Sequence, residues 1–332
     1  GTFQPTGPEG ANTVKIGGAD AAVIWNTTTK IVEGIEAIEV PELDKGEVLV
    51  TVGVLTSAAN PTESLKFARY LAASDRGLKE FRKFGFTPVE GDKWSETPEL
   101  TFFCGSVNRR AVEQAIKSFQ AREGVQVNTV FNGCGILTAQ MKTITNKKLT
   151  GFPDTYMACD KYYLEIVDGL FQDAVEISDT EVVIAVPKGN PKQIKSLADL
   201  ARPGVRVAVG QPDQCTIGVL TRPVLEAEKV YEKVMANVVT QTATSALLIA
   251  PVSTGAADAS LAYLTDTRAE VEKVDAVRIT SAAAKAIQPM GIAKTSRNKH
   301  LARRLIRAIT QARPDFEASG FHRRFDADGS GS

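Results

Sequence analysis

The sequence matches itself at a long and nearly constant spacing. Four blocks recur in the same order: residues 17–25 at 255–263, residues 34–38 at 273–277, Gly53 and Asn60 at Gly291 and Asn298, and Gly85-Phe86 at Gly320-Phe321. The partners lie 235–239 positions apart, far above the repeat length of about 20–50 residues in solenoid proteins. The chain therefore contains part of one large unit, up to about residue 94, followed by a complete one.

Short apolar runs alternate with amphipathic stretches from residue 100 onward. Strands are predicted at residues 100–104, 125–131, 155–159, 182–186, 205–209, 259–264, 274–279 and 290–294, and helices at 111–121, 136–143, 217–228 and 298–311. This alternation is typical of an α/β fold with parallel-rich sheets covered by helices. In the partial unit, the same patterns predict a strand at residues 47–55 and a helix at residues 61–73.

The charge balance and the apolar runs exclude several classes of protein. Lys plus Arg and Asp plus Glu both number 39, so the net charge is zero. Because nucleic-acid binding usually needs a basic surplus, we expect no nucleic-acid partner. No apolar run approaches the ~20 residues that span a bilayer, and no signal peptide is visible at Gly1.

The sequence offers little for catalysis. It has two histidines, His300 in a basic helical stretch and His322 near the C-terminal end, and both are expected at the surface. A Cys-His nucleophile would need one of them in a cleft. The HExxH, GxSxG, Walker A and GxGxxG motifs do not occur. We therefore expect no enzymatic activity and no cofactor.

Four loops of the complete unit carry a resemblance to a known family. They are the sequences Gly105-Ser106-Val107-Asn108, Asn132-Gly133-Cys134-Gly135, residues 151–160, and the stretch from Gly210 to Gly218. In order and spacing, these loops resemble those of the periplasmic molybdate- and tungstate-binding proteins, over about residues 98–322. The resemblance implies the type II periplasmic binding protein fold, a two-lobed Venus flytrap that closes on its ligand by hinge motion.

The domain boundaries follow from the repeat and from this resemblance. The partial solute-binding-protein-like repeat would occupy residues 1–94, the complete two-lobed domain residues 95–324, and a flexible tail residues 325–332. The first lobe would hold about residues 99–180 and 280–324, and the second about 181–279. The partial repeat lacks its first strands, so we expect it to pack against the complete unit or a second copy of the chain.

The resemblance also implies a function. The chain would be a periplasmic or extracellular solute-binding protein of an ABC importer, with a small oxyanion as ligand, the transporter permease as partner, and membrane contact only through that transporter. Helix N-termini supply N–H groups and a partial positive charge to such an anion. The implied ligand residues are Ser106, Cys134, Ile217 and Tyr263, followed by Cys104, Cys215 and Cys159. Ser106 could equally be an ordinary N-cap.

The four cysteines depart from the family pattern. All of them, Cys104, Cys134, Cys159 and Cys215, fall in or beside these loops, and Cys134 stands where the family commonly has a ligand serine. Three interpretations remain open: buried small apolar residues, a Cys104–Cys134 disulfide, or thiolates that bind a soft metal or metalloid. A thiol donates more weakly than a hydroxyl, which puts molybdate specificity in question. A ligand-free sensor or interaction module is the remaining alternative.

Overall fold

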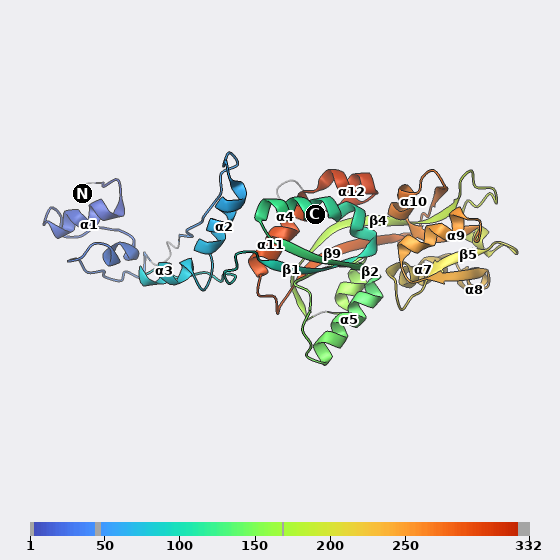
Figure 1. Ribbon diagram of the computed structural model, residues 1–332, viewed down its shortest axis with the longest axis horizontal. Helices are drawn as coiled ribbons and strands as arrows, with labels where there is room; N and C mark the ends of the chain where they lie inside the picture. Colours follow the sequence, from blue (N-terminus) through green and yellow to red (C-terminus); the bar gives the residue numbers. More distant parts are fainter. Residues whose placement is uncertain (1–2, 44–47, 168, 325–332) are drawn as a thin grey trace. The chain divides into compact units, whose positions relative to one another are not determined.

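The computed structural model describes residues 3–43, 48–167 and 169–324 (Figure 1). The chain divides into two compact units, Gly1–Glu96 and Thr97–Ser332. The tail that we expected at residues 325–332 lies outside the described residues. Within the described part, no helix is long and apolar enough to cross a membrane.

The first unit contains helices and irregular segments. Its elements are α1 (Gly7–Lys15), the 3-10 helix η1 (Asn26–Lys30), α2 (Pro61–Leu71) and α3 (Gly77–Lys83). The helix predicted at residues 61–73 is confirmed by α2. The strand predicted at residues 47–55 is wrong for its described part, because residues 48–55 form no strand. A strand needs a neighbour to satisfy its backbone N–H and C=O groups, and no described residue of this unit forms one.

The first lobe of the second unit is built on a mixed sheet. Its strands are β2 (Gln126–Asn132), β1 (Glu99–Gly105), β3 (Thr155–Met157), β9 (Lys285–Ala293) and the first part of β4 (Phe171–Pro187), in that order, with the short β10 (His322–Arg323) also on β4. Its helices are η2 (Ser106–Asn108), α4 (Arg109–Glu123), α5 (Cys134–Asn146), α6 (Lys161–Glu165), α11 (Lys299–Gln311) and α12 (Arg313–Ser319). Strand β1 runs parallel to β2 and β3, whereas β9 runs antiparallel to β3 and β4.

The second lobe has its own strands and helices. The strands are β5 (Val207–Gly210), β6 (Val238–Thr242), β7 (Ala259–Tyr263) and β8 (Val274–Arg278). The helices are η3 (Leu197–Ala201), α7 (Thr216–Ala227), α8 (Tyr231–Met235), η4 (Ser245–Leu248), α9 (Ile249–Ser253) and α10 (Leu264–Ala269). Strand β5 is parallel to β6 and β7, and both β7 and β8 pair antiparallel with β4.

Strand β4 belongs to both lobes. Up to Glu181 it pairs with β9 of the first lobe, and from Val182 it pairs with β7 of the second. The chain therefore crosses between the lobes within one continuous strand and returns through the segment before β9. The two-lobed α/β architecture that we predicted is confirmed.

Helix α4 shows why the first lobe is stable. Its buried side chains recur at helical spacing along one face: Ala111, Val112, Ala115, Ile116 and Phe119. Burying an aromatic or branched side chain of this kind contributes about 1.5–3 kcal/mol. The C-terminal helices α11 and α12 lie beside α4 in Figure 1, although they come from the far end of the chain. Residues close in space but distant in sequence thus complete one core.

Candidate functional site

A small pocket lies between the two lobes of the second unit. Its walls are Ser106, Val107, Gly133, Cys134 and Cys159 from the first lobe and Cys215, Thr216, Ile217, Thr244, Ser245 and Tyr263 from the second. These residues follow or end β1, β2 and β3 in one lobe and β5, β6 and β7 in the other. Within each lobe these strands are parallel, so their carboxyl ends meet at one edge of the sheet, where open α/β sheets bind ligands.

Two direct hydrogen bonds join the lobes beside this pocket. The Gly135 N–H donates to the Gln214 carbonyl at 3.1 Å, and the Tyr163 hydroxyl donates to the Pro212 carbonyl at 3.3 Å. A Cβ at Gly133 would lie 2.5 Å from the Gln214 carbonyl oxygen. Glycine is therefore required at the start of α5 for the lobes to approach this closely.

Two helix N-termini face the pocket. Helix α5 begins at Cys134 and α7 at Thr216, and both residues line the pocket. The first turn of a helix carries N–H groups with no intrahelical acceptor and a partial positive charge. No lining residue has a charged side chain. The pocket can therefore attract an anion without presenting a formal cation.

Two buried hydroxyls add donors to these amides. Neither Tyr263 Oη nor Thr216 Oγ1 forms a hydrogen bond of good geometry with any residue in the described ranges, although both are buried. Burial raises the pKa of Tyr263 well above its ordinary value, and the nearby Thr216 hydroxyl opposes that rise only weakly. The Tyr263 hydroxyl is therefore neutral near pH 7 and can donate a hydrogen bond. A buried hydroxyl normally has a partner, which a ligand in the pocket would supply.

Ser106 lines the pocket and does not cap α4. The N-cap position of α4 is Asn108, whose amide nitrogen donates to the Ala158 carbonyl at 3.2 Å. The short η2 places Ser106 between β1 and α4, at the pocket wall. The sequence allowed Ser106 to be either a ligand contact or an ordinary N-cap, and its position in the pocket wall favours ligand contact.

Comparison with known proteins assigns the chain to a family. The family model described as bacterial extracellular solute-binding protein matches residues 2–87 and 100–322. The chain belongs to this family. Its members are binding proteins and not enzymes, and neither histidine of this solute-binding protein lines the pocket that the described residues form.

Individual relatives match about two thirds of this chain. The molybdate-binding protein ModA of Mycobacterium bovis is 29% identical over 226 residues, which is 67% of this chain and 84% of the relative. Among solved structures, the periplasmic molybdate-binding protein of Azotobacter vinelandii aligns with a TM-score of 0.55 at 19% identity, covering 67% of this chain and 98% of the other. The sulfate-binding protein SubI of Mycobacterium tuberculosis gives 0.55 at 19% identity, covering 68% and 86%. These structures share the fold of this solute-binding protein.

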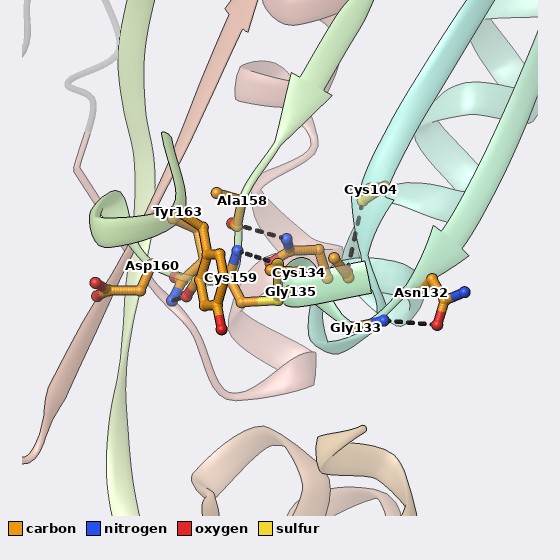
Figure 2. Close-up of a disulfide and its surroundings, with 12 residues drawn as sticks. Cys104, Asn132, Gly133, Cys134, Gly135, Ala158, Cys159, Asp160 and Tyr163 are labelled. Carbon is orange, nitrogen blue, oxygen red and sulfur yellow. Dashed lines mark hydrogen bonds between the residues drawn. A yellow bond between two sulfur atoms is a disulfide. The ribbon is translucent and has the colours of Figure 1, made fainter. Parts of the chain in front are cut away.

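The cysteines pair differently from the disulfide that we considered. Cys134 is bonded to Cys159, and Cys104 is free, so the Cys104–Cys134 interpretation is wrong. Figure 2 shows the disulfide joining the start of α5 to the chain just after β3, with Cys104 lying apart from it. The Cys104 thiol donates to the Gly105 carbonyl and does not line the pocket. It fits the interpretation as a small buried apolar residue.

The structure does not support a thiolate metal site. Burial raises the pKa of Cys104 far above its ordinary range and that of Cys215 to about 11, so both are protonated thiols at neutral pH, whereas metals bind thiolates. Among the described residues, no group of three or more His, Cys, Asp or Glu side chains is placed to hold a metal ion. Cys215 lines the pocket as the N-cap residue of α7.

A buried carboxyl group lies behind the pocket wall. Burial raises the pKa of Asp266 to about 7, although the Ser245 hydroxyl and the Tyr263 N–H oppose the rise. Its Oδ2 atom is buried and has no hydrogen-bond partner among the described residues. Asp266 thus contacts two pocket-lining residues, Ser245 and Tyr263, and has a pKa in the neutral range.

Sequence reasoning found part of this site and missed part. Six of the seven expected residues line the pocket: Ser106, Cys134, Cys159, Cys215, Ile217 and Tyr263. The missed lining residues are Val107, Gly133, Thr216, Thr244 and Ser245. The first three stand inside the loops that carried the resemblance. Thr244 and Ser245 follow β6, a strand that we did not predict, so no loop was expected there.

Proposed function

We propose that this chain is the solute-binding component of an ABC importer and takes up a small tetrahedral oxyanion of the molybdate or tungstate type, outside the cytoplasm and in the periplasm where there is one. The observation that carries the proposal is the pocket wall. It combines two helix N-termini and two unpartnered hydroxyls with no charged side chain. The similarity to molybdate-binding relatives supports the same ligand class.

The pocket is small. Its volume is about 10 Å³, roughly the space that one water molecule needs, so a sugar or a nucleotide does not fit this arrangement, and a tetrahedral oxyanion would have to push the walls slightly apart. The disulfide matters here because the Cys134 sulfur has no hydrogen to donate. Hydroxyls of Ser106, Thr216 and Tyr263, together with backbone N–H groups such as that of Ile217, would replace the serine hydroxyl that the family resemblance implies at the position of Cys134.

The proposal is tested by ligand titration against a pair of matched variants. Calorimetry and thermal unfolding with molybdate, tungstate, sulfate and phosphate should show binding of at least one of them, with about 2.7 kcal/mol of added stability at 100 times the dissociation constant. Tyr263→Phe removes a hydroxyl that would donate to the anion. It should weaken binding by about 10-fold or more, since hydrogen bonds to charged groups contribute about 1.5–3 kcal/mol.

The control is Tyr156→Phe. Tyr156 is also buried with an unpartnered hydroxyl among the described residues, but it lies in β3 and does not line the pocket. Its substitution should leave affinity unchanged. Absence of binding by every oxyanion would overturn the proposal and favour the ligand-free module. Stabilisation only by Cu(I) or Zn(II), under reducing conditions, would move the site to the cysteines.

A further inference from the structure

Each helix of the first unit has a counterpart near the end of the second. The pairs are α1 with η4 and α9 together, η1 with α10, α2 with α11, and α3 with α12. Helices α1 and α2 begin 238 positions before η4 and α11, and α3 begins 236 positions before α12. These are the spacings at which the sequence matches itself, so the two units share a run of local structure as well as residues.

Backbone conformation repeats at the ends of these helices. Gly17 follows α1 with a φ of +75°, and Gly255 follows α9 with +76°. Gly85 follows α3 with +85°, and Gly320 follows α12 with +92°. A positive φ after a helix is the left-handed termination that favours glycine. The repeat therefore extends to the geometry of two chain reversals.

An aromatic contact repeats as well. The rings of Phe81 and Phe86 lie 5.4 Å apart between centroids, and those of Phe316 and Phe321 lie 5.7 Å apart. In both cases the N–H of the second Phe donates to the carbonyl of the first, at 3.2 and 3.0 Å. The same turn is thus closed by the same side chains in the two units.

The strands are where the two units differ. In the second unit β7, β8 and β9 lie in sequence between these helices, and they pair with β3, β4 and β5. Their counterparts in the first unit, residues 21–25, 35–39 and 48–55, form no strand. The reason is that β3, β4 and β5 all precede η4, and the first unit contains no described segment equivalent to them.

The unpaired segments expose apolar side chains that their counterparts bury. Val23 is 84% exposed and its counterpart Leu261 is fully buried, while Val52 is 50% exposed and its counterpart Met290 is fully buried. Unpaired strand segments with apolar side chains are templates for a further polypeptide, which can complete the sheet by strand addition.

We infer that the first unit is the last third of a solute-binding domain, and that residues 21–25, 35–39 and 48–55 form a docking surface for a polypeptide equivalent to the first two thirds of that domain. In this chain the equivalent of that polypeptide is residues 99–244. A second copy of the chain does not supply it, because its own β3, β4 and β5 are already paired with its own β7, β8 and β9.

The completed domain would have a different pocket from the second unit. Trp25 stands at the position of Tyr263, 238 positions earlier. An indole N–H only donates a hydrogen bond, whereas a phenol both donates and accepts. The two domains would therefore bind different solutes, or the same solute with different affinity.

The test supplies the complementary polypeptide. An additional copy of residues 98–244 is fused ahead of Thr6 of the full chain, and amide hydrogen exchange is followed at residues 48–55. In the fused protein these amides should exchange at least about 100-fold more slowly than in the unfused chain, as expected for residues that enter a stable sheet.

Val52→Asp provides the control. In the unfused chain this side chain is half exposed, so the substitution should change neither exchange nor unfolding. In the fused protein it would bury an unpaired carboxylate, and protection at residues 48–55 should be lost. Equal exchange in fused and unfused chains would overturn the inference. Protection already present in the unfused chain would also overturn it: concentration-dependent protection would identify a second copy as the occupant, and concentration-independent protection would mean that the chain covers this surface itself.

Discussion

The N–H of Gly135 donates to the carbonyl of Gln214 at 3.1 Å, so the first turn of α5 in one lobe is bonded to the turn before α7 in the other. This bond exists only when the lobes are closed. A substitution at this bond changes the free energy of lobe closure without removing any group that contacts the ligand.

Substituting Gly135 by alanine should weaken ligand binding without unfolding the protein. The added Cβ would clash with the Asp213 carbonyl oxygen, so the closed state would lose population and the apparent affinity would fall in proportion. We expect a loss of about 10-fold or more, equivalent to about 1.4 kcal/mol, in calorimetric titration with molybdate. Gly53→Ala is the control, because a Cβ there meets nothing within 4 Å. Unchanged affinity in Gly135→Ala would show that closure is not required.

Removing the disulfide should destabilise the second unit. Cys134 and Cys159 are separated by 25 residues, and a disulfide that closes a loop of that length contributes about 3.5 kcal/mol. The double variant Cys134→Ala, Cys159→Ala should therefore have a free energy of unfolding lower by about this amount, measured as a lower midpoint of urea unfolding. Thiol titration of the denatured, unreduced protein should find two reactive cysteines, Cys104 and Cys215. Four reactive cysteines would contradict the pairing.

Oxyanion affinity should fall as the pH rises through about 7. Burial holds the pKa of Asp266 at about 7, so the folded protein keeps this carboxyl protonated at pH 6 and carries a negative charge behind the pocket at pH 8. Burial keeps Cys215 and Tyr263 uncharged across this range. Asp266→Asn should flatten the decline in affinity measured at pH 6, 7 and 8, and a decline that persists in this variant would assign the effect to another group.

The same carboxyl predicts how stability depends on pH. Between about pH 4 and pH 7 the folded state binds a proton at Asp266 that the unfolded state has lost. The contribution of Asp266 to the free energy of unfolding therefore decreases as the pH rises over this window and stays low above it. Urea unfolding at pH 5 and pH 8 should show a larger stability difference for the wild type than for Asp266→Asn.

The ion pair between Glu123 and Arg304 should contribute more to the free energy of unfolding than an ion pair between two exposed side chains. Glu123 ends α4, has a side chain only 4% exposed, and bonds Arg304 of α11 through both carboxylate oxygens. Glu123→Ala removes both hydrogen bonds but leaves Arg304 partly exposed to solvent, so it should cost about 1.5 kcal/mol in urea unfolding. Glu113→Ala, on the exposed face of the same helix, should cost less than about 0.5 kcal/mol. Similar losses in the two variants would contradict this assignment.

The parts of the fold that sequence predicted are those in which local pattern and tertiary context agree. Strand β1 and helix α4 have the periodicities of their structures, and the loop between them places Ser106 in the pocket. Strand β4 was predicted only at residues 182–186, because its first part mixes charged and apolar residues and becomes a strand through pairing with β9.

Two errors have the same physical origin. Residues 48–55 have the composition of a strand but no described neighbour to pair with. The disulfide joins Cys134 to Cys159, two residues after β3, because β3 lies beside β1 in the sheet. Both outcomes depend on which strands are neighbours in the sheet, and the local residue pattern does not reveal the strand order.

The shared strand β4 and the late strand β9 also fix the order in which the lobes can mature as the chain is synthesised. The second lobe is assembled from residues 182–278, a contiguous stretch that is complete as soon as it leaves the ribosome. The first lobe must wait for β9, which lies between β3 and β4. Its early strands are therefore exposed for the longest time, which is the interval when a chaperone would be needed.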